Sequence, residues 1–365
     1  MGSIRKRPNG AYEARYRDPY GRDRSKTFRT KGEARAFLTH VESSKQTGSW
    51  VDPQRARIRF SVWAEEERKT WADLRPATRA RADSLMRSHV MPEFGDAPLG
   101  SISPLAVQAW VNELVALDLS SSTVHGCYRV LSRVMSAAVR SELIPASPCR
   151  EITLPRPDHS EMKFLTADEL HRLAEVAGPF RTLILSGGYL GLRWGELAGL
   201  RRKRFNPLKA TIEVVEILTE VAGRLEFGPP KTKASRRQVS LPAFLNALLR
   251  QQTEAQGGGP NDLVFVGRDG GPLRRTNFRK RHWIPSLERA GLSIAVRFHD
   301  LRHTCAALLI AQGAHPKEIQ ARLGHSSITT TLDRYGHLFP SLDERLKSGL
   351  DELFRTTEAH ETGAG

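Results

Sequence analysis

Hydrophobic and polar residues alternate along the first 50 positions of the chain, as they do in β-strands that bury one face. In residues 12–17, two tyrosines and an alanine fall on one face, while a glutamate and two arginines fall on the other. The Asn9-Gly10 pair before this segment is typical of a hairpin turn. Further turn and strand signals lead into a helical pattern over residues 31–46. The pattern predicts a small module of a β-sheet plus one helix.

Residues 58–145 show only the spacing of apolar positions that is typical of amphipathic helices. Ser103 and Pro104 form a helix start, with serine as the cap and proline in the first turn. The pattern predicts a compact all-α domain. Four prolines and little periodicity follow in residues 145–160, which suits an extended linker between two domains.

From Phe164 onward, helical and strand patterns mix. Helical spacing marks residues 166–177 and 179–190, strands are predicted at 210–218 and 237–242, and further helices continue to the end. These patterns predict a larger mixed domain. At 365 residues the chain is long enough for two or three domains with substantial cores, so we expect a multidomain protein.

The net charge of the chain indicates what kind of partner it binds. The chain has 56 Lys and Arg against 40 Asp and Glu, a net charge of +16 and a pI near 10.2. Such an excess points to a polyanionic partner. It is uneven, because residues 1–50 hold twelve basic and five acidic side chains while residues 341–365 hold three and six. Arg15 and Arg17 make one face of the N-terminal sheet mostly basic, although a merely solvated face would carry the same charges.

Apolar segments and cysteines bear on the compartment. No apolar run approaches the roughly 18 residues of a membrane span, and the start MGSIRKRPNG has no apolar signal segment. We therefore expect a cytoplasmic protein without a membrane partner. Cys127, Cys149 and Cys305 are odd in number and never spaced as CxxC, so neither a disulfide framework nor a zinc knuckle is indicated.

Candidate catalytic side chains occur in short fragments of the last domain, each of which is weak evidence by itself. A tyrosine such as Tyr335 usually packs on the core and turns its hydroxyl toward water. His299 and His303 have the spacing of zinc-protease histidines, but Asp300 stands where that motif needs glutamate as general base. We therefore expect no metal and no cofactor. Six residues form an ordered set along the chain: Arg193, Lys231, His299, Arg302, His325 and Tyr335.

The ordered set Arg, Lys, His-x-x-Arg, His, Tyr resembles the motif of the tyrosine recombinase (phage integrase) family. The resemblance covers residues 160–345, and every motif position matches. K-T-x-x-S-x-R beginning at Lys231 fits the family pattern better than a motif that begins at Lys233. The resemblance implies four parts: an arm-type DNA-binding domain over 1–50, a helical core-binding (SAM-like) domain over 58–145, a mainly-α catalytic domain with a small antiparallel sheet over 160–345, and a C-terminal tail over 346–365.

The resemblance also implies catalytic roles. Arg193 and Arg302 hold the scissile phosphate through planar, permanently charged forks and stabilise its transition state. Tyr335 attacks phosphorus, with His299 as the candidate general base and His325 as a hydrogen-bond donor to the phosphate.

The resemblance also places Lys231, on a mobile hairpin, as the general acid for the 5′ oxygen. Three other residues are interpreted as lying outside the reacting set. Glu196 supports the site without reacting. His303 and His337 lie behind the site or at the surface.

The implied function is site-specific recombination of double-stranded DNA at attachment sites. A homotetramer would act through a Holliday junction and a 3′-phosphotyrosine, integrating or excising a prophage or another mobile element. A host DNA-bending factor and an excision factor are further partners that this function allows. Two alternatives stay open. One is a relaxing topoisomerase of the type IB kind, against which the basic N-terminal module argues. The other is a non-catalytic DNA-binding regulator, against which the complete set of six residues argues.

Overall fold

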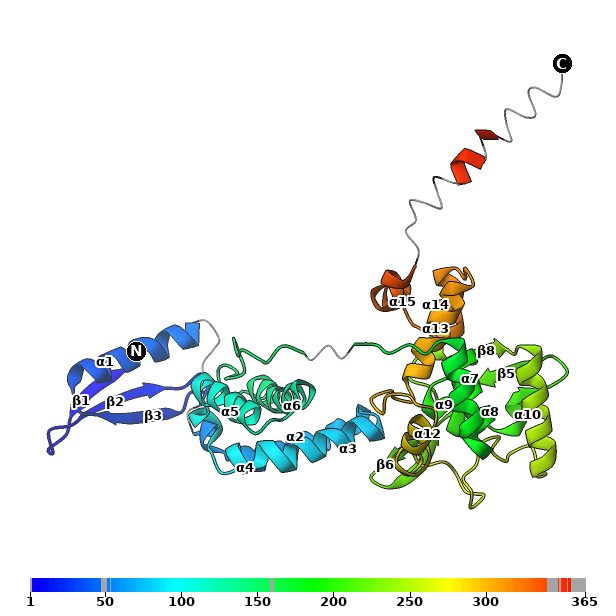
Figure 1. Ribbon diagram of the computed structural model, residues 1–365. Helices are drawn as coiled ribbons and strands as arrows, with labels where there is room; N and C mark the ends of the chain where they lie inside the picture. The colour runs from blue at the N-terminus through cyan, green and yellow to red at the C-terminus, as the bar shows by residue number, and fades with distance from the viewer. Residues whose placement is uncertain are drawn as a thin grey trace. The chain divides into compact units, whose positions relative to one another are not determined.

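The computed structural model describes residues 2–46, 51–52, 54–157 and 161–339, together with 347, 349–352 and 354–355. The chain divides into two compact units, Met1–His159 and Ser160–Gly365 (Figure 1). Each unit has its own buried hydrophobic residues. Most of the predicted C-terminal tail, 346–365, lies outside the described residues.

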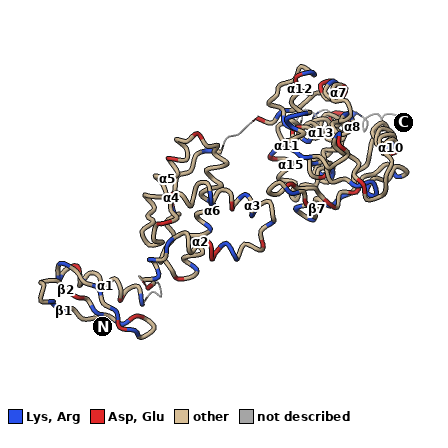
Figure 2. The backbone as a smooth tube through the Cα atoms, turned by 90° about the horizontal axis from the view of Figure 1, so that it is seen from below, with Lys and Arg blue, Asp and Glu red and all other residues tan. Residues whose placement is uncertain are grey.

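The first unit opens with a three-stranded antiparallel sheet and one helix: β1 (Ser3–Lys6), β2 (Tyr12–Arg17), β3 (Asp23–Phe28) and α1 (Lys31–Gln46). The predicted turn between β1 and β2 is present, with Gly10 at a φ of +82°, which glycine adopts without a steric penalty. Ala14 and Tyr16 are buried on the face of β2 that α1 covers, whereas Arg15 and Arg17 lie exposed. Figure 2 shows basic residues in blue along the N-terminal strands, with acidic residues in red among them.

Helices make up the rest of the first unit: α2 (Phe60–Lys69), α3 (Pro76–Leu85), α4 (Met91–Phe94), α5 (Pro104–Ala116) and α6 (Ser121–Arg140). The predicted helix start is confirmed, because the Ser103 side chain accepts a hydrogen bond from the Ala106 N–H at 3.1 Å and Pro104 opens α5. The core between these helices includes Trp71, Trp110 and Leu131. This part of the chain is all-α, as its periodicity predicts.

The second unit is mainly helical. Its helices are α7 (Ala167–Val176), α8 (Arg181–Leu190), α9 (Trp194–Ala198), α10 (Ala243–Gln256), α11 (Arg275–Phe278), α12 (Ile284–Arg289), α13 (Asp300–Ala311), α14 (Pro316–Leu323) and α15 (Ile328–Tyr335). Its strands are β4 (Phe205–Asn206), β5 (Thr211–Val214), β6 (Ile217–Val221), β7 (Arg224–Gly228) and β8 (Arg237–Ser240). Among these helices and those of the first unit, none in the described residues has the length and apolar composition needed to cross a bilayer.

The strands of the second unit form two small antiparallel sheets. One sheet has the order β4-β5-β8, and the other is the β6-β7 hairpin. The single strand predicted over 210–218 is therefore wrong in detail, because it is divided between the two sheets. Ile212 of β5 lies opposite Val239 of β8, whereas Ile217 of β6 lies opposite Gly228 of β7. An apolar run contains no signal for the point at which its hydrogen-bonding partner changes.

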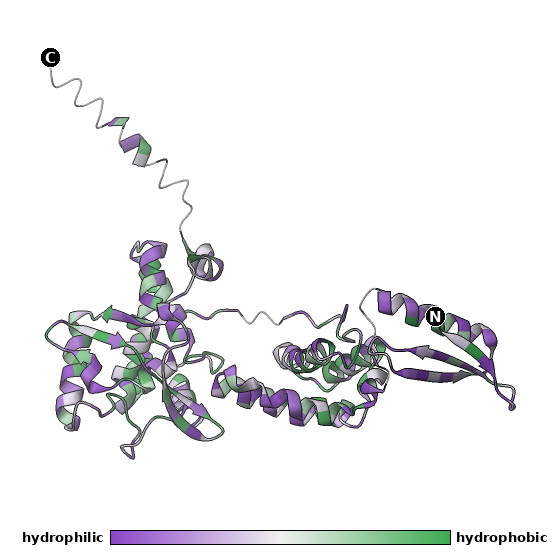
Figure 3. Ribbon diagram, turned by 180° about the vertical axis from the view of Figure 1, so that it is seen from behind, coloured by the Kyte–Doolittle hydropathy of each residue, from purple (hydrophilic) through white to green (hydrophobic). Residues whose placement is uncertain are grey.

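Two closely packed helices hold the centre of the second unit. Along α8 almost every side chain is buried, and Figure 3 shows hydrophobic residues gathered in the central helices. A Cβ placed on Gly187 of α8 would come within 2.8 Å of the Leu301 side chain of α13. Helix α8 ends at Gly191, whose φ of +65° is in the left-handed region. The segment after Gly191 and the start of α13 are thus fixed to one rigid core.

Candidate active site

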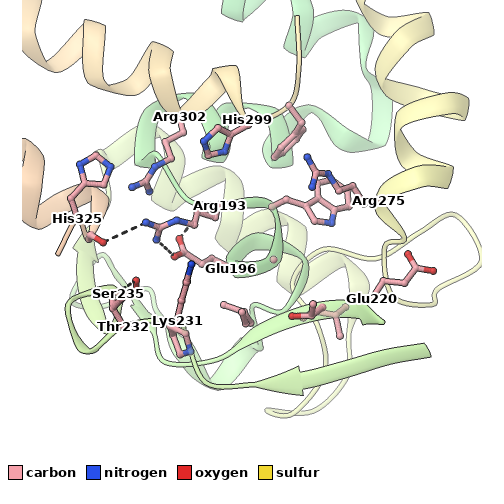
Figure 4. A pocket seen from close by; sticks show the side chains of 18 of the residues that line it. Arg193, Glu196, Glu220, Lys231, Thr232, Ser235, Arg275, His299, Arg302 and His325 are labelled. Carbon is pink, nitrogen blue, oxygen red and sulfur yellow. Dashed lines mark hydrogen bonds and ion pairs between the residues drawn. The ribbon is translucent and has the colours of Figure 1, made fainter. Parts of the chain in front are cut away.

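A cavity of about 1020 Å³ opens in the second unit and brings together five of the six predicted residues. Figure 4 shows them converging from different segments of the chain. The wall includes Arg193, Lys231, His299, Arg302 and His325. Arg275 and Arg334 add two further cations that the sequence prediction missed. This excess of positive charge in a concave site is suited to an anion such as a phosphate.

Arg193 is held where α8 gives way to α9. Its backbone N–H donates to Glu196 Oε2 at 2.9 Å, and its Nη1 donates to Glu196 Oε1 at 2.8 Å. The Glu196 carboxylate therefore both caps the start of α9 and orients the Arg193 guanidinium. The Arg193 side chain remains 37% exposed, so part of the fork faces the cavity.

Glu196 is a buried carboxylate shared by two arginines. Arg237 donates from Nη1 to Oε1 at 3.2 Å and from Nη2 to Oε2 at 3.0 Å, the same two oxygens that accept from Arg193. Burial by itself would raise the pKa of Glu196, but the charges and hydrogen bonds of Arg237 and Arg193 outweigh that effect and lower it. Glu196 is thus ionised at neutral pH and links Arg193 to Arg237.

Arg302 is a nearly desolvated cation, with 2% of its surface exposed. Its Nη1 donates to the Gly191 carbonyl at 2.7 Å, and its Nη2 donates to the Leu323 carbonyl at 2.6 Å. Burial, followed by the charge of Arg193, lowers the pKa of Arg302 to about 9. Two guanidinium groups held near each other raise one another's free energy, and a bound phosphate would relieve this repulsion.

The two histidines of the wall are both neutral at neutral pH. Burial, with smaller contributions from His303 and Arg302, lowers the pKa of His299 to about 4. Burial and the charges of Arg302 and Arg193 lower the pKa of His325 to about 3. His325 follows the left-handed Gly324 at the end of α14, and its Nδ1 lies 2.9 Å from the Thr331 hydroxyl. A neutral imidazole offers one donor and one acceptor nitrogen to a substrate.

Tyr335 does not lie on the cavity wall. It is fully buried at the end of α15, with its hydroxyl 2.9 Å from His303 Nδ1. Its ring lies nearly parallel to that of His325, with 6.4 Å between ring centroids. Burial raises the pKa of Tyr335, although Arg302 and Arg334 act in the opposite direction. The structure therefore places Tyr335 behind the pocket as a protonated phenol.

Lys231 lies on the cavity wall but not on a hairpin. It occupies the connection from β7 to β8, which belong to different sheets, so that expectation is wrong. A hydrogen bond of 3.0 Å between the Thr232 and Ser235 hydroxyls closes the K-T-x-x-S turn after it. Figure 4 shows the Lys231 side chain pointing toward Glu196 and Arg193. Lys233 is not part of the wall.

Two further histidines were expected behind the site or at the surface. His303 is buried and contacts Tyr335, whereas His337 is exposed and lies beside Phe164 with 6.4 Å between ring centroids. His303 and His299 pack edge to face at 5.1 Å. In the described residues, no group of three or more His, Cys, Asp or Glu side chains is arranged to hold a metal ion.

Comparison with known proteins places this site in a family. Models of three phage integrase regions match successive parts of the chain: the N-terminal domain at 1–47, the N-terminal SAM-like domain at 59–115, and the phage integrase family domain at 163–341. The prophage phiRv2 integrase of Mycobacterium tuberculosis is 29% identical over 375 residues, covering 98% of this chain and 97% of that protein. The integrase of Mycobacterium phage L5 is 27% identical, with 98% of each chain covered.

Solved structures share the fold at low identity. The Tn1549 transposon integrase in complex with transposon right end DNA has a TM-score of 0.69 at 20% identity, covering 81% of this chain and 99% of that one. The lambda integrase tetramer bound to a Holliday junction has a TM-score of 0.59 at 20% identity, covering 89% and 96%. The matching family domains, the full-length integrase relatives and the shared fold lead to one conclusion: the chain belongs to the phage integrase family and is a tyrosine site-specific recombinase.

Proposed function

We propose that this recombinase integrates or excises a mobile element by cleaving and rejoining double-stranded DNA, with Tyr335 as the covalent nucleophile. The observation that supports this proposal is the cavity in which two arginines, a lysine and two neutral histidines meet directly beside a buried tyrosine. Phosphodiester transfer needs charge neutralisation, a nucleophile and a proton donor, and this arrangement contains all three.

The proposed cleavage step balances as follows. The guanidinium groups of Arg193 and Arg302 bind the non-bridging oxygens of the scissile phosphate. The Tyr335 oxygen forms a bond to phosphorus while the bond to the 5′ oxygen breaks. The phenolic proton passes to His299, and Lys231 gives a proton to the departing 5′ oxygen. His325 donates a hydrogen bond to the phosphate, and a 5′ hydroxyl from another duplex reverses the step.

Tyr335 has to leave its buried position before it can attack. Its hydroxyl is bonded to His303 and its ring lies outside the cavity wall, so a phosphate in the cavity is not yet in line with it. Helix α15 is only 8 residues long and is joined to His325 by two residues. A helix this short can move as a unit. We infer that DNA binding shifts α15 so that Tyr335 enters the cavity.

The partners in this proposal are DNA and further copies of the chain. Residues 1–50 would bind arm-type sites, residues 58–145 would bind the core site, and residues 160–345 would cut it. A homotetramer acting through a Holliday junction follows the assembly named for the lambda integrase structure. A host DNA-bending factor and an excision factor would assist at attachment sites, and the reaction would take place in the cytoplasm, where bacterial DNA lies.

Recombination is favoured over the two alternatives. A relaxing topoisomerase would not need the N-terminal module, whose strands present Arg15 and Arg17 to solvent. A regulator without catalysis would not need Arg302 to be kept charged at 2% exposure, which costs free energy unless a phosphate is bound.

The test is covalent trapping on attachment-site DNA taken from the ends of the element that carries the gene. We expect a protein–DNA adduct from the wild-type chain, with or without a chelator of divalent metals, because Arg193, Arg302 and Lys231 supply the positive charge. Tyr335→Phe should bind the same DNA and form no adduct. An adduct at wild-type levels in Tyr335→Phe, or complete loss of cleavage in chelator, would contradict the proposal.

A further inference from the structure

Arg237 is a buried arginine at the first position of β8 that none of the proposed catalytic steps uses. Its side chain is 6% exposed. Besides its two bonds to Glu196, it donates from Nε to the Arg322 carbonyl at 2.6 Å and from Nη1 to the Ser235 carbonyl at 3.1 Å. One guanidinium thus joins three segments: the start of α9, the Lys231 connection and the end of α14.

The net charge of Arg193, Arg237 and Glu196 gives a reason for two arginines to share one carboxylate. Arg193 and Glu196 alone would form a neutral pair, in which the carboxylate draws the Arg193 fork away from the cavity. The second positive charge, on Arg237, gives the three side chains a net charge of +1. Arg237 and Arg193 both bond to the two Glu196 oxygens, so one of the two positive charges is left uncompensated, and of these two arginines it is Arg193 that lies on the cavity wall.

Arg237 also packs directly beneath the turn that carries His325. A Cβ placed on Gly324 would come within 3.1 Å of Arg237 Nη1 and 3.0 Å of the Ala234 carbonyl. Gly324 has a φ of +68°, so this turn depends on glycine both for its backbone and for the space above the guanidinium. Arg237 therefore contacts both the Lys231 connection and the turn that carries His325.

We propose that Arg237 is a positioning residue for strand cleavage: by offsetting the negative charge of Glu196 it leaves the positive charge of Arg193 available to the scissile phosphate. This inference rests on the proposed function, because it assumes that Arg193 binds the phosphate. Arg237 itself bonds to Glu196 and does not line the cavity. Its effect on cleavage passes through the carboxylate.

A double-mutant cycle tests the inference. Single-turnover rates of covalent adduct formation, and separately the affinity for attachment-site DNA, are measured for wild type, Arg237→Met, Glu196→Gln and the double variant. Arg237→Met should slow adduct formation by about tenfold with little change in affinity for DNA. This loss of rate is smaller than the roughly 10²–10³-fold loss expected for a donor that touches the transition state. In the Glu196→Gln background, where there is no carboxylate charge to neutralise, the same substitution should cost less than about threefold.

Two control variants sharpen the result. Arg204→Met removes another arginine that pairs with a glutamate, Glu213, on the neighbouring strand but away from the cavity, and should leave the rate unchanged. Arg237→Lys keeps the charge but cannot reproduce the fork's four hydrogen bonds, and should stay within about fivefold of wild type. The Lys variant also decides the question if Arg237→Met does not fold, which thermal unfolding would reveal.

The outcomes separate this inference from the proposed function. If the wild-type chain forms no Tyr335 adduct, the proposed function fails. If it does, an equal cost of Arg237→Met with and without Glu196 would mean that Arg237 acts only through its carbonyl contacts. That result, or a defect in Arg237→Lys as large as in Arg237→Met, would overturn the inference.

Discussion

Replacing Tyr335 with phenylalanine should destabilise the second unit as well as abolish catalysis. The hydroxyl of Tyr335 lies 2.9 Å from His303 Nδ1, and the two residues are 0% and 4% exposed. Removing the hydroxyl leaves a buried ring nitrogen without this partner, and water has little access to replace it. An unsatisfied buried polar group costs about 1–3 kcal/mol. For a unit of this size, each kcal/mol lowers the unfolding temperature by roughly 2–4 °C.

The assay is thermal unfolding of the full chain at neutral pH. Unfolding is monitored by calorimetry, so that the transition of the second unit is seen separately. His303→Phe in the Tyr335→Phe background is the matched control, because replacing both partners by apolar groups removes the unpaired nitrogen. The double variant should therefore be less destabilised than the sum of the two single variants. An unfolding temperature of Tyr335→Phe within about 1 °C of wild type would refute the reasoning, because the hydroxyl could not then be buried against His303.

Three further predictions concern the general acid, acid stability and the N-terminal module. Lys231→Ala should slow strand cleavage far more than Lys233→Ala, since only Lys231 lies on the cavity wall; the reverse order in single-turnover assays would move the general acid. The free energy of unfolding in urea should fall as pH drops from about 6.5 toward 4, by up to about 1.4 kcal/mol per pH unit for each histidine, because the unfolded chain binds protons that the folded chain excludes. A flat profile over this range would contradict the lowered pKa values of His299, His303 and His325. Deleting residues 1–50 should leave cleavage of a short core site intact but abolish recombination between full attachment sites. It should also flatten the salt dependence of DNA binding, because affinity falls by roughly 0.9 log units per log unit of salt for each phosphate contact. Normal recombination by the truncated chain would reduce this module to a basic structural cap.

Much of the architecture could be predicted because it depends on local patterns. The alternation in β2 places Ala14 and Tyr16 on the buried face, since successive side chains of a strand point to opposite sides. Ser103 and Pro104 mark the start of α5 because only residues next to one another in sequence are needed to cap a helix. The candidate catalytic set came from the resemblance to the tyrosine recombinase motif, which depends on residue types and their order along the chain, and its catalytic roles stay a prediction.

Other features depended on contacts between distant segments. The run over 210–218 divides between two sheets because β8 and β7 pair with its two halves, and neither pairing is encoded in the run itself. The K-T-x-x-S-x-R motif pointed to Lys231, but the function of its last residue, Arg237, depends on Glu196, which lies 41 positions away. Packing alone brings these residues together.

The sequence by itself determined which chemical groups this protein has, the order in which they occur and the local elements that carry them. Only the tertiary structure decided which of those groups face the cavity. Tyr335 and Lys231 both belong to the predicted catalytic set, yet Tyr335 is buried against His303 and Lys231 is on the cavity wall. The physical reason is that burial, and with it the pKa and reach of each side chain, is set by the surrounding segments that exclude water, and those segments come from every part of the unit.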